Sequence, residues 1–335
     1  MEQVKKIIAD IKKDEVKPIY FLMGEEPYYI DSLASYFEKN LLTEEEKGFN
    51  QSVLYGRDVS IDDIVSSAKR FPMMAKYQLL IVKEAQDLSR SIEKLVKYAE
   101  NPQPSTVLVI CYKYKKLDKR KALYKTLNKS AEVFESKPLY DNQIPDWIAK
   151  VLRGKNYTIT PKASLLLVEF LGTDLGKINN ELEKLQLILP EGSQITPELI
   201  EENIGISKDF NNFELQKALG EKDFKKAFRI IDYFSQNPRE HPVLQTTAIL
   251  FSFFTKILKY HSLNNQDKAN VAKTLGVNPF FVKDYAVAAR NYKMKEVSGI
   301  VEKLREVDAK SKGVGANGAH TSDLFKELLI KVSLK

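Results

Sequence analysis

The stretch PIYFLMGEEPYYID, residues 18–31, decides the fold expected for the first part of the chain. The apolar run Ile19–Met23 predicts a short buried strand, Gly24 predicts the turn after it, and Pro27 is typical of the first turn of a helix. A strand, a glycine turn and a helix in this order are typical of the start of a nucleotide-binding α/β domain. The turn is therefore the place where a phosphate-binding loop is expected.

The turn lacks the side chains that bind phosphate. A phosphate loop reads Gly-x-x-x-x-Gly-Lys-Ser/Thr, in which the glycines let backbone N–H groups face the phosphates, the lysine supplies charge and the hydroxyl binds Mg²⁺. Counted from Gly24, the last three of these positions are held by Tyr29, Ile30 and Asp31. The two glutamates after Gly24 would each repel a phosphate charge at about 4 Å by roughly 1 to 4 kcal/mol. We expect a structural turn that hydrolyses nothing, with a divergent phosphate site as the alternative.

A second position needed for ATP hydrolysis is also changed. The segment LLIVKE, residues 79–84, has the form of the metal-binding strand of a nucleotidase, in which four apolar residues precede Asp-Glu. Lys83 holds the aspartate position, and a cation cannot bind Mg²⁺. The sequence therefore lacks two groups that one ATP site needs, the phosphate-loop lysine and the metal-binding aspartate.

Strands and helices alternate over residues 1–140, and only helices are predicted after them. Further strands are predicted at 50–55, 78–82, 105–112 and 131–135, which gives a βαβ domain with a parallel sheet of about five strands. Helices with apolar spacings near 3.6 are predicted in a bundle over 141–208 and in a second helical domain over 209–335. The expected fold class is α/β followed by all-α.

Four local features are expected within this plan. They are an amphipathic helix at 1–16, a charged turn at 43–49, a flexible loop at Gly313–His320, and a helix at Leu244–Tyr260 that is apolar nearly all round. The last of these must be covered on every side, within the chain or in part by neighbouring subunits.

Composition and charge narrow the function. Of 335 residues, 43% are hydrophobic and 29% charged, and no stretch approaches the roughly 18 uninterrupted apolar residues of a membrane span. The first residues lack the apolar core of a signal peptide, so a cytoplasmic protein is expected. The net charge of +7 is a small excess for a chain of this length, and it favours an acidic partner or nucleic acid over a merely solvated surface. The basic segment 113–129, with its interleaved tyrosines, is either a nucleic-acid contact or a solvated helix face.

No cofactor, metal site or catalytic set is expected. The single cysteine, Cys111, lies in an apolar run and is expected to be a buried, inert thiol. His241, His261 and His320 do not stand in any spacing known from metal sites or nucleophilic triads.

The segment FPMMAK, residues 71–76, lies between a predicted helix and the strand at 78–82. Pro72 ends or kinks the predicted helix that precedes it, so Met73 and Met74 lie on a short helical turn or loop. Either the two methionines fill the core from this connector, or they form an exposed docking site, for which unbranched and polarizable side chains are suited. The residues alone leave both interpretations open.

Several segments together make the chain resemble the delta subunit of the bacterial DNA polymerase III clamp loader over nearly its whole length. They are YFLMGEEPYYID (20–31), FPMMAKYQLLIVKEA (71–85), WIAKVLRGKNYTIT (147–160), FLGTDLGKINNELEKL (170–185), NNFELQKALGEKDFKKAF (211–228), VNPFFVKDYAVAAR (277–290) and VDAKSKG (307–313). The order and spacing of the segments make the resemblance specific.

The resemblance implies an AAA+-like parallel-sheet domain over 1–140 without a functional phosphate loop, a three-helix lid domain over 141–208 and a helical collar domain over 209–335. It implies that the chain joins delta-prime and the ATP-binding subunits in a pentameric ring within the DNA polymerase III holoenzyme. No catalysis is expected from the isolated chain, and primer-template DNA is expected to be bound through the assembled loader. The Ser-Arg-Cys arginine-finger motif of the other subunits is absent, and Asn128-Lys129-Ser130 is the nearest segment.

In that family a Leu-Phe pair on a short helix before the third strand inserts into the hydrophobic pocket of the sliding clamp and helps to open it. Met73 and Met74 hold those positions in this sequence, with Phe71 and Pro72 before them. The resemblance therefore implies that these four residues bind the clamp, although methionines lack the ring contacts of an aromatic side chain.

Two other functions stay open on the residues alone. One is a nucleic-acid remodelling AAA+ ATPase with a degenerate phosphate loop, and the other is a helical scaffold whose α/β domain is only a docking module. ATP affinity and hydrolysis separate the first from a clamp-opening subunit. Clamp binding separates the second from it.

Overall fold

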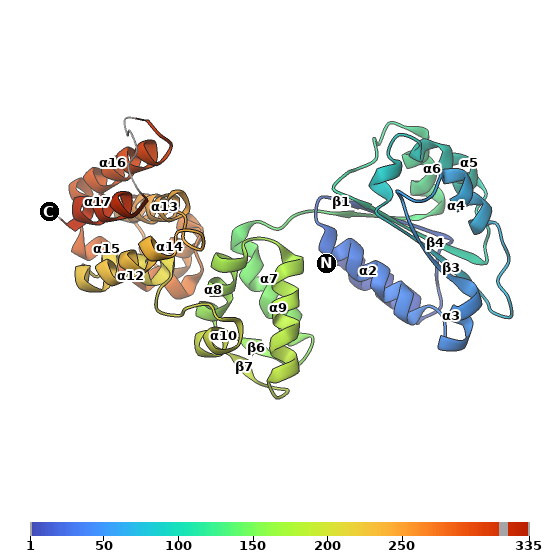
Figure 1. Ribbon diagram of the computed structural model, residues 1–335, viewed down its shortest axis with the longest axis horizontal. Helices are drawn as coiled ribbons and strands as arrows, with labels where there is room; N and C mark the ends of the chain where they lie inside the picture. The colour runs from blue at the N-terminus through green and yellow to red at the C-terminus, as the bar shows by residue number, and fades with distance from the viewer. Residues whose placement is uncertain (1, 315–320, 334–335) are drawn as a thin grey trace. The chain divides into compact units, whose positions relative to one another are not determined.

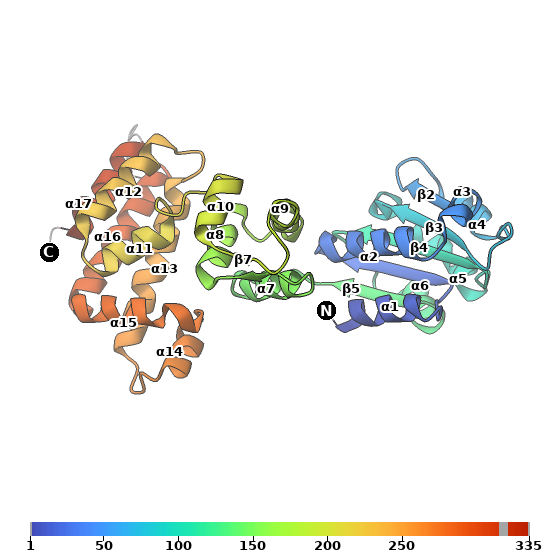
Figure 2. The same ribbon diagram turned by 90° about the horizontal axis from the view of Figure 1, so that it is seen from below.

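The computed structural model describes residues 2–314 and 321–333 and divides the chain into two compact units, Met1–Leu139 and Tyr140–Lys335 (Figures 1 and 2). The first unit contains a parallel sheet with helices, and the second is almost entirely helical. The predicted fold class, α/β followed by all-α, is confirmed. The further division of the helical unit into a lid and a collar after residue 208 stays a prediction.

In the described part of the first unit, the sheet has five parallel strands in the order β2-β3-β4-β1-β5. The strands are β1 (Ile19–Gly24), β2 (Gln51–Tyr55), β3 (Gln78–Lys83), β4 (Thr106–Lys113) and β5 (Glu132–Ser136). Strand β1 pairs with β4 so that Gly24 lies opposite Lys113. This register brings the turn after β1 next to the carboxyl end of β4, the edge at which parallel sheets carry their sites.

Helices cover both faces of this sheet, as Figure 1 shows for α2 on one face and α4 to α6 on the other. On the first face lie α1 (Glu2–Lys12) and α2 (Pro27–Asn40), and on the second lie η1 (Ala85–Leu88), η2 (Ile92–Leu95), α4 (Ile61–Ala68), α5 (Val96–Glu100) and α6 (Ala122–Ser130). Phe37 of α2 packs with Leu22 in one core, and Leu123 of α6 packs with Phe21 in the other. Every residue of β1 is buried, which explains why its sequence is a continuous apolar run.

Two segments of the first unit differ from the expectation. Residues 43–49, expected as a charged turn, form the cap and most of helix α3 (Glu44–Asn50), with Thr43 as the cap. The Thr43 hydroxyl accepts a hydrogen bond from the Glu46 N–H at 3.4 Å, and the Glu46 carboxylate accepts one from the Thr43 N–H at 2.9 Å. This reciprocal cap satisfies two N–H groups, so the run of glutamates starts a helix. The other difference is that α1 ends at Lys12 rather than at residue 16.

The helical unit begins with η3 (Asp141–Gln143), α7 (Ile144–Arg153), α8 (Pro161–Leu171), α9 (Leu175–Ile188) and α10 (Pro197–Ile204). Thr160 and Asp174 cap α8 and α9, because their side chains accept hydrogen bonds from the N–H groups of Ala163 and Lys177, at 3.3 and 3.0 Å. Two strands that pair in parallel, β6 (Thr158–Ile159) and β7 (Gln194–Ile195), were not predicted. With two residues each, they are too short for a sequence pattern.

The unit continues with α11 (Asn212–Gly220), α12 (Phe224–Gln236), α13 (Val243–His261), α14 (Lys268–Leu275), η4 (Pro279–Phe281), α15 (Val282–Asn291), α16 (Met294–Ser311) and α17 (Thr321–Ser333). These helices share one core that contains Phe234, Phe254 and Leu304. The predicted loop at Gly313–His320 lies outside the described residues from 315 onward.

Among the described residues, one face of helix α13, the nearly all-apolar helix of the sequence, is buried and another face is exposed. Leu250, Phe254 and Ile257 are fully buried, whereas Leu244 and Phe251 are 44% and 42% exposed. Residues seven positions apart lie on the same face of a helix. An apolar stripe of α13, defined by Leu244 and Phe251, is therefore open at the surface of the helical unit.

Candidate functional site

Backbone N–H groups in the turn after β1 are bonded within the protein. The N–H of Gly24 donates to the Lys115 carbonyl at 3.1 Å, and the N–H of Glu25 donates to the Ser136 carbonyl at 3.3 Å. Gly24 has a φ of +132°, and a Cβ at this position would lie 2.1 Å from the Ser136 carbonyl oxygen. The glycine is therefore required by the close approach of β5, and the amides that would face a phosphate already have protein acceptors.

The start of α2 is closed to a phosphate in the same way. The Glu26 carboxylate accepts a hydrogen bond from the Tyr28 N–H at 2.9 Å, and Pro27 has no N–H to offer. Ile30, at the position of the phosphate-loop lysine, is fully buried in the core. A helix start that is normally suited to anions is thus capped by the protein's own carboxylate.

A lysine bridges two carboxylates at positions that belong to the nucleotide site of an ATPase. The Lys113 Nζ lies 2.7 Å from Asp31 Oδ1 and 2.7 Å from Glu84 Oε1. Asp31 stands at the hydroxyl position of the phosphate loop, and Glu84 at the glutamate position of the metal-binding strand. Burial lowers the pKa of Lys113, but its hydrogen bonds to the two carboxylates outweigh this effect and leave the pKa above its ordinary value. Lys83, at the aspartate position, pairs with Glu38 at 3.2 Å.

The segment 71–76 is a loop without regular secondary structure. Met74 is fully exposed, Met73 is 61% exposed, Phe71 is also exposed, and Pro72 is half-buried. The interpretation that the methionines fill the core is therefore wrong, because their side chains lie in solvent. The short helix that the resemblance implies at this place is not formed in this segment.

The loop is held by a residue that sequence reasoning missed. Asn50, the last residue of α3, is buried, and its side-chain amide bonds to both backbone polar groups of Met73, accepting from the N–H at 2.6 Å and donating to the carbonyl at 3.0 Å. Phe49, the residue before it, is exposed. No periodic pattern connects residues 50 and 73, so the sequence carries no signal for this contact.

Five of the eight cations in the basic segment 113–129 lie in ion pairs with carboxylates. The paired residues are Lys113, Lys116, Lys119, Arg120 and Lys121. A cation that is already paired gains less from a phosphate than an unpaired one. The pairing favours the interpretation of this segment as a solvated face.

Among the described residues, no group of three or more His, Cys, Asp or Glu side chains could hold a metal ion. Cys111 is buried as predicted, and burial raises its pKa to about 12, so the thiol stays protonated. His241 stacks on Phe234 with ring centroids 4.0 Å apart, and burial lowers its pKa. His320 lies outside the described residues. None of the described helices is long and apolar enough to cross a bilayer.

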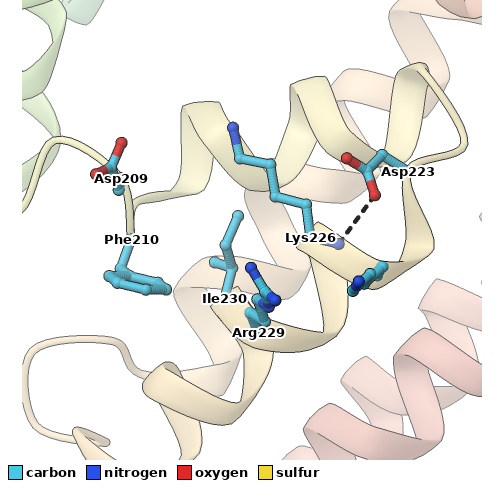
Figure 3. A pocket seen from close by; sticks show the side chains of 7 residues that line it. Asp209, Phe210, Asp223, Lys226, Arg229 and Ile230 are labelled. Carbon is cyan, nitrogen blue, oxygen red and sulfur yellow. Dashed lines mark hydrogen bonds between the residues drawn. The ribbon is translucent and has the colours of Figure 1, made fainter.

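A small pocket of the helical unit, with a volume of about 390 Å³, lies beside the start of α12 (Figure 3). Its lining combines cations with carboxylates, including Lys226, Arg229, Asp209 and Asp223. Lys226 is committed within the protein, because its N–H donates to Asp223 Oδ1 at 3.0 Å and its ammonium pairs with Glu214. Because cations and carboxylates are mixed in its lining, the pocket favours neither an anionic nor a cationic ligand.

A larger cavity of about 1170 Å³ in the same unit has aromatic walls that include Phe213, Phe253 and Tyr285. Glu169 of α8 also lines it, and its Oε1 accepts a hydrogen bond from the Asn212 N–H at the start of α11 at 2.6 Å. No group in the described part of the chain is hydrogen-bonded to the buried Oε2 of Glu169. Burial raises the pKa of this carboxyl to about 7.

Comparison with known proteins agrees with this architecture. The family model for the DNA polymerase III delta subunit matches residues 20–137, and the model for the C-terminal domain of the same subunit matches residues 209–330. DNA polymerase III subunit delta of Bacillus subtilis (strain 168) is 29% identical, over 97% of this chain and 95% of that protein. The probable DNA polymerase III subunit delta of Aquifex aeolicus (strain VF5) is 22% identical, over 88% of this chain and 86% of that protein.

A solved structure, the Bacillus subtilis DNA clamp loader delta protein, has a similar fold. It matches with a TM-score of 0.52 and 24% identity, over 99% of this chain and 100% of that one. The two family models describe one family, match both units and together cover well over half of the sequence. The chain therefore belongs to the family of DNA polymerase III delta subunits.

Proposed function

We propose that the chain is the clamp-binding subunit of a replicative clamp loader, which docks on the DNA sliding clamp through Met73 and Met74, helps to open it, and hydrolyses no ATP. Membership of the family of DNA polymerase III delta subunits supports a role in DNA replication. The observation that carries the proposal is the exposure of both methionine side chains on a braced loop. Large apolar side chains that are held in solvent are typical of a surface that a partner covers.

The two methionines are sufficient for a specific contact. Burial of one methionine side chain is worth roughly 1.5 to 3 kcal/mol. Immobilising each side chain costs about 0.5 to 1.5 kcal/mol. The pair therefore contributes a net of roughly 2 to 4 kcal/mol, which corresponds to a 30-fold to 1000-fold change in affinity. An apolar pocket on the clamp is the chemistry that fits two flexible thioether side chains.

The alternative of a nucleic-acid remodelling ATPase requires a site for Mg·ATP. The bonded amide of Gly24, the buried Ile30 and the ammonium of Lys113 all oppose such a site. The alternative of a scaffold leaves the exposed methionines without a role. Both alternatives are weaker than the clamp-binding function on these grounds.

The proposal includes the partners and the place of action. Delta-prime and the ATP-binding subunits complete a heteropentamer in the cytoplasm, and primer-template DNA is contacted through the assembled loader. The open stripe of α13, Leu244 and Phe251, supports an assembly surface on the helical unit, because a neighbouring subunit would cover apolar side chains that the chain leaves exposed.

The test is the double variant Met73→Ala/Met74→Ala in the isolated chain. We expect clamp binding, measured by surface plasmon resonance, to weaken about 30-fold to 1000-fold, with an unchanged melting temperature. Leu187→Ala is the matched control, because Leu187 of α9 is also a strongly exposed aliphatic residue but lies in the other unit. Unchanged clamp affinity of the double variant, with a folded protein, would contradict the proposal.

A further inference from the structure

The side chain of Asn50 makes the same pair of bonds to the 71–76 loop that a neighbouring strand would make. Its Oδ1 accepts from the Met73 N–H and its Nδ2 donates to the Met73 carbonyl. Both polar groups of one backbone residue are therefore satisfied by one side chain from a segment 23 positions earlier in the chain. A two-point bond of this kind fixes the orientation of the Met73 backbone as well as its position.

Asn50 is itself held rigidly. Its residue is only 4% exposed, and its Nδ2 also donates to the Glu46 carbonyl at 3.1 Å, one turn earlier in α3. The other end of α3 carries the cap formed by Thr43 and Glu46. The rotamer of Asn50 is thus set by the fold of the sheet domain before any partner binds.

Other contacts of the loop are exposed and weaker. Lys76 pairs with Asp14, but both side chains are exposed, and such pairs contribute little. Met74 has a φ of +52°, a conformation that non-glycine residues adopt only when their surroundings enforce it. The bonded Met73 directly precedes Met74, so Asn50 is the buried link that can enforce this backbone.

We propose that Asn50 is the positioning residue of the docking loop: it fixes the Met73 backbone so that both methionine side chains are presented to the clamp in their binding conformation. This inference rests on the proposed function. Without Asn50 the loop would have to be ordered when the clamp binds, and preorganisation removes that cost from the binding step. Because Asn50 is only 4% exposed, it acts through the loop and not through contacts of its own with the clamp.

The test compares Asn50→Ala with Asn40→Ala in the full chain. Asn40, at the end of α2, donates to the Tyr36 carbonyl at 2.9 Å, so it makes the same bond to the preceding turn, but within the described part of the chain it makes no hydrogen bond to the loop. We expect Asn50→Ala to weaken clamp binding about tenfold. The same change should accelerate hydrogen exchange of the Met73 amide, and Asn40→Ala should do neither.

A double-variant cycle separates positioning from a general loss of stability. When Met73 and Met74 are already alanine, adding Asn50→Ala should change clamp affinity by less than about twofold, because the side chains that it positions are gone. If the Asn50→Ala protein does not fold, Asn50→Ser replaces it, because a serine can keep the bond to the Glu46 carbonyl but cannot reach Met73. The same tenfold effect is expected of that variant.

The outcomes are distinct. An equal loss of affinity in both backgrounds, or none in either, would overturn the role of Asn50 while leaving the docking loop intact. Unchanged affinity of the Met73→Ala/Met74→Ala protein would instead overturn the proposed function itself.

Discussion

Replacement of Lys113 by methionine tests whether an internal ammonium takes the place of metal and nucleotide in the sheet domain. Methionine keeps most of the length and volume of the lysine side chain but removes its charge. Asp31 and Glu84, whose oxygens each lie 2.7 Å from the Lys113 Nζ, then lose the cation between them. We expect the domain to be destabilised by the repulsion of two carboxylates without a counter-ion.

The structure sets the size of this effect. The Lys113 side chain is 11% exposed, but those of Asp31 and Glu84 are 51% and 38% exposed. Breaking a fully buried pair costs about 3 to 5 kcal/mol, whereas an exposed pair is worth about 0 to 1 kcal/mol. A buried cation between two partly solvated anions lies between these limits, so Lys113→Met should lower the free energy of unfolding by about 1 to 3 kcal/mol.

Native-state hydrogen exchange of the β1 and β4 amides is the suitable assay, because it reports the opening of the first unit separately from the second. Lys116→Met is the matched control, since Lys116 also lies between two carboxylates, those of Glu25 and Glu135 at 3.1 and 3.3 Å, but is more exposed. Because Lys116 is exposed to solvent, this change should leave the protection of the β1 and β4 amides nearly unchanged. Millimolar Mg²⁺ or Ca²⁺ should restore part of the stability of Lys113→Met and leave the wild type unchanged.

Two results would refute this reasoning. One is equal protection of β1 and β4 in the Lys113→Met, Lys116→Met and wild-type proteins. The other is a divalent-cation effect of the same size in the wild type, which would mean that Lys113 does not occupy the space between the carboxylates.

Three further predictions concern both units. Calorimetry with millimolar Mg·ATP should show no binding, because Ile30 and Lys83 replace the groups that hold phosphate and metal; a micromolar site would contradict this. Below pH 4.5 Glu169 is protonated in both the folded and the unfolded protein. The folded protein keeps this proton up to about pH 7, so the contribution of Glu169 to the free energy of unfolding decreases as the pH rises from 4.5 to 7. The wild type should therefore lose roughly 3 kcal/mol relative to Glu169→Gln between pH 4 and pH 8, measured by urea unfolding; parallel pH profiles would refute it. Leu244→Lys/Phe251→Lys should keep the melting temperature but prevent assembly with the other loader subunits in size-exclusion chromatography; normal assembly would exclude the α13 stripe as an interface.

Local sequence signals were sufficient for the five strands of the sheet domain. The run Ile19–Met23, the turn at Gly24 and the helix start at Pro27 are each specified by neighbouring residues, and all three lie where predicted. The start of α3 carried a local signal too, because Thr43 and Glu46 have the spacing of a capping box. The high charge of the segment favours a turn over a helix, and here the capping signal proved the better guide.

Contacts between distant segments were not predictable. Methionines serve equally well in cores and in docking surfaces, so only the fold could place Met73 and Met74 in solvent. The bond from Asn50 to Met73 joins segments that no periodicity relates. The exposed face of α13 depends on which helices pack against it, and an apolar helix does not carry that information in its own sequence.

The bonded turn after β1 has a consequence for whether mutation could give this chain a nucleotide site. A lysine in place of Ile30 would bring an ammonium group into the hydrophobic core rather than toward a phosphate. Even with that lysine, the N–H groups of Gly24 and Glu25 would still be bonded to carbonyls of Lys115 and Ser136. Nucleotide binding would thus require the 115 and 136 segments to move away together with several side-chain changes. No single substitution would therefore turn this loop into a nucleotide site.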